Sequence, residues 1–301
     1  MKRFLSIVLL CAISLLSVSG CVKQTEGNKL KIIATLFPQY DFARVIAGDK
    51  AEVAMLLPTG ADSHSYDPTP ADIVNFNKAD LFIYTGSEME PWADKMVKSA
   101  TDNVRVLDVS DEIELCGEHS HDDHSHLSDP HIWTSPKNAV KMVDNILKAL
   151  CEIDSDNKEY YTKNAEAYKA KLNELDESFR SIVNNGKRKM MLFAGRFAMH
   201  YFAEEDGIEH VAAVDACTSD AQASTKSVAM IIDTVKSENI PVVYYEELAD
   251  PKVAKMIADE TGCKILLFHS CHNISIKEKE SGATYLSLMQ QNAENLKKGL
   301  N

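Results

Sequence analysis

Histidine is the residue type in this chain whose placement most plainly indicates chemistry, because imidazole is a common ligand of transition-metal ions. The chain has ten histidines, and they are unevenly spread. His64 lies in the turn-rich stretch GADSHSYDPTPAD, and His131 lies in DPHIWTSP. His269 directly follows the apolar run 265–268, and His272 comes three residues later. These positions fall at or near the ends of predicted strands, where α/β sheets present ligand sites, so the pattern indicates metal binding.

Four more histidines share one biased segment, CGEHSHDDHSHLS, at residues 116–128. Together with Asp122 and Asp123 they form a set that could gather metal weakly near a main site. The alternative is a solvated loop with no role. The four residues of this auxiliary metal loop are His119, His121, His124 and His126.

The type of ligand favours zinc. Imidazole suits Zn2+, whereas Mn2+ prefers sets rich in oxygen, and the sequence offers several histidines with no certain carboxylate. Nickel, cobalt and copper also bind imidazole, and the order of affinities does not exclude them. Acids near the histidines could orient the rings through hydrogen bonds, and the candidates are Asp62, Asp67, Asp129 and Glu246.

The elements that must position these residues alternate between strand and helix patterns, which predicts an α/β fold with parallel sheets. Residues 30–153 form one such lobe and residues 187–301 form another. Between them, residues 154–186 carry apolar side chains at spacings of three, four and seven, which predicts one long helix. We therefore expect two Rossmann-like parallel-sheet lobes joined by a long backbone helix. The predicted strands are 31–35, 53–57, 81–84, 104–107, 189–194, 209–214, 241–245 and 264–268.

The N-terminus has the features of an export signal. Lys2 and Arg3 precede the apolar run FLSIVLLCAISLLSV, which is too short for a comfortable membrane span. The run ends in Val-Ser-Gly-Cys, which resembles the lipobox of bacterial lipoproteins. That resemblance implies a signal peptide at residues 1–20 and lipidation of Cys21, with residues 21–29 as a tether. The protein would then be anchored to the outer face of the cell membrane.

Composition sets further bounds. The 301 residues are 45% apolar, enough for one large core or two ordinary ones, and the formal net charge is -13. No basic block follows the first few residues, which argues against a nucleic-acid partner. If Cys11 leaves with the signal and Cys21 is lipidated, five cysteines remain and no CxxC occurs, so no disulfide is assigned. The five are Cys116, Cys151, Cys217, Cys263 and Cys271.

Several motifs in order resemble the solute-binding lipoproteins of zinc/manganese ABC importers, the cluster A-I metal-binding family. They are GADSHSYDPTPAD, DPHIWTSP, ENIPVVYYEE followed by IADETGCKIL, and the closing YLSLMQQNAENLKKGL. The resemblance covers essentially the whole chain after the signal. It implies two α/β lobes joined by a long helix, with the metal in the cleft between them. It also implies permease and ATPase partners, and we expect a monomer.

Carried over by position, His64 and His131 match the two ligands that the family takes from the first lobe. In the second lobe the usual ligand position holds Arg196, which has five donors and no acceptor and cannot ligate a cation. His269 is therefore the expected third ligand, with His200, His272, Cys217 or a water as candidates. Arg196, Glu246 and Asp129 are expected beside the ligands. Arg196 would pair with an acid such as Glu246 or Asp215 or latch the lobes; alternatively, it is a surface residue.

The function expected from these observations is capture of Zn2+, less readily Mn2+, in the cleft between the lobes and delivery to an ABC importer. A surface zinc buffer or adhesin is an alternative that lipid anchoring fits equally well. A zinc-dependent hydrolase is disfavoured, because the sequence has no HExxH motif and no nucleophile elbow. Glu246 is the residue that would serve as its general base. The protein is therefore expected not to be an enzyme.

Overall fold

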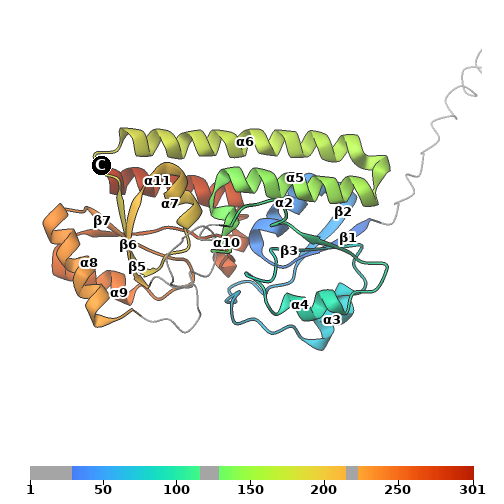
Figure 1. The fold of residues 1–301 in the computed structure, drawn as a ribbon, viewed down its shortest axis with the longest axis horizontal. Coiled ribbons are helices and arrows are strands. Elements are labelled where there is room, and N and C mark those ends of the chain that lie inside the picture. Colours follow the sequence, from blue (N-terminus) through green and yellow to red (C-terminus); the bar gives the residue numbers. More distant parts are fainter. Residues whose placement is uncertain (1–28, 116–128, 215–222) are drawn as a thin grey trace, which may run out of the picture.

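The computed structural model describes residues 29–115, 129–214 and 223–301. They form two α/β lobes that lie side by side beneath one long helix (Figure 1). Each lobe contains a four-stranded sheet in which every pair of neighbours is parallel, and the two sheets have equivalent strand orders, β2-β1-β3-β4 and β6-β5-β7-β8. The expected fold class is confirmed.

In the N-terminal lobe all four strands lie where the sequence predicted them. They are β1 (Leu30–Ala34), β2 (Ala51–Met55), β3 (Leu81–Tyr84) and β4 (Arg105–Asp108). The helices between them are α2 (Phe37–Ala47), α3 (Pro70–Phe76) and α4 (Ala93–Lys98). α3 starts as its sequence requires, because Thr69 and Asp72 form a reciprocal capping box and Pro70 occupies the first turn.

The C-terminal lobe repeats this order. Its strands are β5 (Met190–Arg196), β6 (Glu209–Val214), β7 (Val242–Tyr245) and β8 (Lys264–Leu267). Its helices are α7 (His200–Asp206), α8 (Thr225–Glu238), α9 (Lys252–Thr261), α10 (Ile276–Glu280) and α11 (Tyr285–Leu300). In both lobes the parallel strands therefore deliver their carboxyl-terminal loops to one edge of the sheet, where α/β proteins bind ligands.

The linking helix α6 (Lys158–Asn185) has 28 residues and so spans about 42 Å at 1.5 Å per residue. It packs against α2, α5 (Pro136–Ile153) and α11, and so bridges both lobes (Figure 1). Its buried face repeats every three or four residues. That face consists of Tyr161, Ala165, Tyr168, Leu172, Leu175, Phe179 and Val183.

One apolar core runs beneath this helix through both lobes. It includes Phe42 and Trp133 on the N-terminal side and Phe202 and Phe268 on the C-terminal side. Two smaller clusters lie within single lobes, around Ile231 and around Phe82. The shared core joins the lobes into one body. No helix of the described residues is long and apolar enough to cross a membrane.

Candidate metal centre

His64 lies in the loop that follows β2, and a single carboxylate shapes that loop. Oδ1 of Asp62 accepts hydrogen bonds from the backbone N–H groups of His64, at 2.9 Å, and Ser65, at 3.2 Å. This is the local turn that a short acidic side chain favours. Trp92 Nε1 donates to the carbonyl of Ser63 at 3.1 Å, which ties the loop to the lobe behind it. The half-buried His64 ring is thereby held at the cleft between the lobes.

His131 is fully buried and is oriented by Asp129, as the sequence predicted. Asp129 Oδ1 accepts from the His131 backbone N–H at 2.9 Å and lies 2.5 Å from its Nδ1. Asp129 is itself fixed, because the Tyr201 hydroxyl donates to its carbonyl oxygen at 2.6 Å. With Nδ1 bonded to a carboxylate, Nε2 is the nitrogen of His131 that can ligate a metal.

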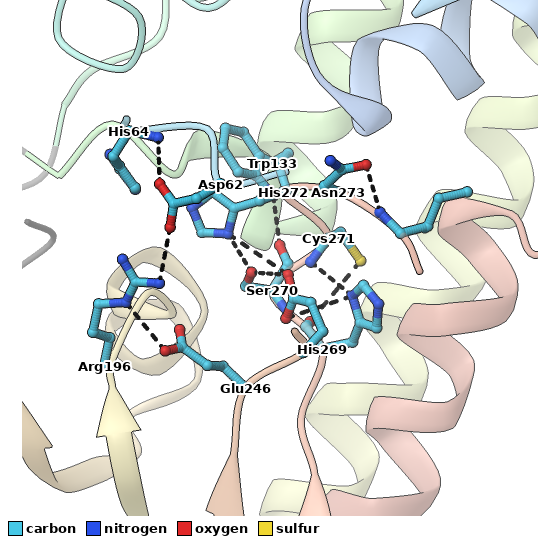
Figure 2. A network of polar contacts seen from close by, with 12 residues as sticks. Asp62, His64, Trp133, Arg196, Glu246, His269, Ser270, Cys271, His272 and Asn273 are labelled. Atoms are coloured by element: carbon cyan, nitrogen blue, oxygen red, sulfur yellow. Dashed lines mark hydrogen bonds and ion pairs between the residues drawn. The ribbon is translucent and has the colours of Figure 1, made fainter. Parts of the chain in front are cut away.

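His272 comes from the loop after β8 and points into the same space from the C-terminal lobe (Figure 2). Its Nδ1 is hydrogen-bonded to Ser270 Oγ, and Glu247 Oε1 lies 3.7 Å from the same nitrogen. Its Nε2 is buried and has no hydrogen-bond partner among the residues that the structure describes. Trp133 Nε1 donates to the Ser270 carbonyl at 2.7 Å and fixes this loop against the N-terminal lobe.

These three histidines form one cluster. One ligating nitrogen of each lies within 4.8 Å of the others, and the described residues contain no other group of three potential metal ligands this close. Ring centroids are 5.6 Å apart for His64 and His131, 5.4 Å for His64 and His272, and 4.4 Å for His131 and His272. Nitrogens around a tetrahedral zinc ion stand about 3.3 Å apart, so small side-chain rotations would bring the three into coordination.

The electrostatics of the cluster favour the form of histidine that ligates. Burial, together with the neighbouring histidines, lowers the pKa of His64 to about 3. Burial and the proximity of His131 lower the pKa of His272 to about 4. Both rings are therefore neutral near pH 7, and their lone pairs are available to a metal without loss of a proton.

His269 does not belong to this cluster, which corrects the expectation that it is the third ligand. Its Nδ1 accepts from the Cys271 backbone N–H at 2.9 Å, and its Nε2 lies 3.4 Å from Glu278 Oε1. The Asn292 side chain accepts a hydrogen bond from the His269 backbone N–H at 2.7 Å and donates one to the His269 carbonyl at 2.8 Å. Cys271, between the two histidines, has a positive φ of 64°. The chain turns there, so His269 faces α10 and α11 while His272 faces the cleft (Figure 2).

The other candidates from the sequence lie elsewhere. His200 begins α7, and its ring packs edge-on against Phe197, with centroids 4.9 Å apart, outside the cluster of three. Among the cysteines, Cys151, Cys263 and Cys271 carry free thiols. Cys21, Cys217, Asp215 and the four histidines of the auxiliary metal loop lie outside the described residues.

Arg196 ends β5 and joins the two lobes at the mouth of the cleft. Its Nε donates to Glu246 Oε1 at 3.1 Å, and its Nη2 donates to Asp62 Oδ2 at 3.4 Å (Figure 2). Glu246 follows β7 in the same lobe, whereas Asp62 belongs to the loop that carries His64. The expected pairing with Glu246 is therefore present, and Asp62 is the second partner.

Sequence reasoning missed two residues that shape the site. Glu247 is buried beside His272, and its carboxylate accepts the Ser270 backbone N–H at 2.7 Å. Asn273 Nδ2 donates to the carbonyls of Pro58 and Ala61, at 2.7 and 2.9 Å, and ties the two ligand loops together. For Glu247 the sequence offers one signal, the two consecutive acids Glu246 and Glu247 after the predicted strand 241–245, but it does not show which of them faces His272.

Two parallel-sheet lobes under a common long helix, with a cluster of metal-ligating side chains between them, define a two-lobed solute-binding protein. Residues 32–299 match the family described as "ZnuA: Zinc-uptake complex component A periplasmic", and the chain belongs to that family.

Two curated relatives and one solved structure illustrate the similarity. The "High-affinity zinc uptake system protein ZnuA" of Bacillus subtilis is 35% identical over 287 residues, covering 92% of this chain and 89% of that protein. "Zinc-binding lipoprotein AdcA" of Streptococcus pneumoniae is 31% identical over 306 residues, which cover 98% of this chain and 60% of AdcA. The structure of the "Metal-dependent Lipoprotein YcdH" from Bacillus subtilis superposes with a TM-score of 0.79 at 35% identity, covering 90% of this chain and 99% of that one.

Proposed function

We propose that the protein captures Zn2+ between its lobes, on His64, His131 and His272, and delivers it to the permease of an ABC importer. The observation that carries the proposal is the cluster of three imidazoles within 4.8 Å, two of which have depressed pKa values and are neutral near pH 7. A set made only of imidazole nitrogens suits Zn2+ better than Mn2+. The relatives named for zinc uptake and zinc binding support the same ion.

The protein would act outside the cytoplasm. Lipidation of Cys21, which the sequence resemblance implies, would hold it on the outer face of the membrane, and AdcA is likewise named a lipoprotein. A bound ion would leave through the mouth of the cleft, a pocket of about 150 Å³ that Asp62, Arg196 and Glu246 line together with His64 and His272.

Binding rather than catalysis is supported by the acids around the site. A hydrolase needs a free general base beside a metal-bound water. Here Asp129 is bonded to His131, Glu246 to Arg196, and Glu247 to Ser270. Each of these carboxylates therefore positions another side chain or a loop. We place a role as zinc buffer or adhesin second, because the relative from Bacillus subtilis is named for zinc uptake.

Calorimetric titration tests the proposal. Residues 22–301 contain every described element and would be stripped of metal and titrated with Zn2+ and with Mn2+. We expect one Zn2+ per chain, and a loss of affinity of about 100-fold or more for His64→Ala, His131→Ala and His272→Ala, because even residues that only orient ligands contribute 10–100-fold.

His269→Ala is the matched control, because it removes a neighbouring buried histidine from the same loop. We expect it to retain zinc affinity within about tenfold, the lower limit for loss of a residue that orients a ligand. Zinc binding that survives all three ligand substitutions, or that is lost only with His269→Ala, would contradict the proposed site.

A further inference from the structure

Arg196 is an unexpected residue for a cation-binding pocket. It lines the same pocket of about 150 Å³ as His64 and His272. The positive charge of its guanidinium disfavours a second positive charge in that pocket. An arginine in this place weakens the attraction for any cation. Its role must therefore lie in the groups that it binds.

Those groups are Asp62 and Glu246, two of the acids that line the pocket. The guanidinium donates to Glu246 through Nε at 3.1 Å and to Asp62 through Nη2 at 3.4 Å. The side chains are partly buried, with 25% of Arg196, 11% of Glu246 and 37% of Asp62 exposed. A planar guanidinium can hold two carboxylates in fixed directions at once, which the single ammonium of a lysine does less well.

Without Arg196, the carboxylate of Glu246 and Oδ2 of Asp62 would lose this partner in the pocket that His64 and His272 also line, while Asp62 Oδ1 would still accept from the backbone of its own loop. Asp62 is two residues from His64 in the same loop. Glu246 follows β7 in the other lobe and lines the same pocket. Oxygen ligands of this kind are what Mn2+ prefers, whereas a nitrogen set suits Zn2+. The remaining acids are already engaged, since Glu247 accepts from Ser270 and Asp129 from His131.

We infer that Arg196 is a metal-selectivity residue, which binds the carboxylates of Asp62 and Glu246 and so withholds oxygen ligands from the metal site. This inference rests on the proposed function, because it takes the three histidines as the ligands. It gives a physical reason for an arginine in a pocket that also holds two of the proposed zinc ligands. The side chain that cannot ligate keeps the site nitrogen-only.

The test compares the affinities of the full metal-free chain for Zn2+ and Mn2+ in the wild type and in Arg196→Gln. Zn2+ is followed by competition calorimetry, and bound Mn2+ by loss of the free-ion signal in electron paramagnetic resonance. We expect the ratio of the Mn2+ to the Zn2+ dissociation constant to fall at least about tenfold in Arg196→Gln, since released carboxylates favour the harder ion. Adding Glu246→Gln to that variant should restore most of the ratio.

Two further variants keep the test decisive. Arg105→Gln removes an arginine from an exposed pair with Glu152, 3.1 Å apart, and should leave the ratio unchanged. Arg196→Lys retains the positive charge but not the planar group that holds two carboxylates, and should lower the ratio in the same direction by less. An unchanged ratio in both Arg196 variants, with normal zinc binding through the histidines, would overturn this inference and leave the proposed function standing. Failure of the wild type to bind zinc would overturn both.

Discussion

Asp129 shows how much of a metal site depends on a residue that does not touch the metal. Its carboxylate accepts from the backbone and faces Nδ1 of His131, and its carbonyl accepts from Tyr201. This contact fixes both the ring orientation and the tautomer of a buried ligand. The same carboxylate also gives the ring more electron density, which strengthens the bond to a metal.

Asp129→Asn should therefore weaken zinc binding by about 10–100-fold, as for other residues that orient metal-bound histidines. The amide keeps the shape of the carboxylate but loses its charge. Calorimetric titration measures the change. Asp67→Asn is a matched control, since it alters an exposed aspartate of the His64 segment and should change the affinity little. Equal losses in the two variants would refute the orienting role of Asp129.

A second residue-scale consequence concerns Glu90, which is fully buried in the N-terminal lobe. It accepts from the Thr85 backbone N–H at 2.6 Å, and burial raises its pKa from 4.5 to about 8. Between pH 4.5 and 8 the folded protein therefore holds a proton that the unfolded chain has lost. Through this group, the free energy of unfolding falls as pH rises over that window.

Glu90→Gln should remove this dependence, because the amide is neutral at every pH. We expect the metal-free variant to melt higher than the wild type at pH 8, by about 2–4 °C for each kcal/mol gained, and the difference to shrink toward pH 5. Thermal unfolding followed by circular dichroism measures it. Glu88→Gln, two residues away and exposed, should show no such pH-dependent difference. A Glu90→Gln variant that is less stable at pH 8 than at pH 5, relative to wild type, would exclude this account.

At the scale of elements, the regular apolar patterns predicted the fold, whereas the irregular loops limited how well the metal ligands could be predicted. The eight strands follow from apolar patterns, and the structure confirms them to within two residues at each end; α6 (Lys158–Asn185) lies within the predicted range 154–186. The choice between His269 and His272 could not be made this way, because it depends on a left-handed residue at Cys271. A non-glycine residue in that conformation leaves no sequence signal. The short helix α10 was also missed, since five residues cannot establish a period.

The loops also explain why Arg196 was only partly understood from sequence. The sequence predicts that Arg196 pairs with an acid such as Glu246 or latches the lobes, and the contact with Glu246 confirms the pairing, but the sequence does not name the partner in the other lobe. Its contact with Asp62 joins positions 134 residues apart. Such a pair depends on how two lobes face each other, which local propensity does not encode.

At the scale of the whole molecule, the question is how far the lobes can separate to admit a metal ion. The apolar core beneath α6 is continuous through both lobes. Polar contacts reinforce it, since Trp133 donates to Ser270, the Tyr285 hydroxyl donates to the Trp133 carbonyl at 2.5 Å, and the Tyr285 backbone N–H donates to Asp41 at 2.9 Å. A wide opening would expose this core and break buried hydrogen bonds, which costs free energy on both counts.

We therefore expect the metal-free and zinc-loaded proteins to have nearly the same overall shape. Their radii of gyration in small-angle X-ray scattering should agree within about 1 Å, comparable to the backbone shifts of pre-organised binding sites. An increase of several ångströms in the metal-free protein would show that the lobes part despite the shared core. Arg196→Gln serves as a comparison, because it removes the ion pair at the cleft mouth but leaves the core intact. If the core rather than this pair holds the lobes together, the variant should scatter like the wild type in both states.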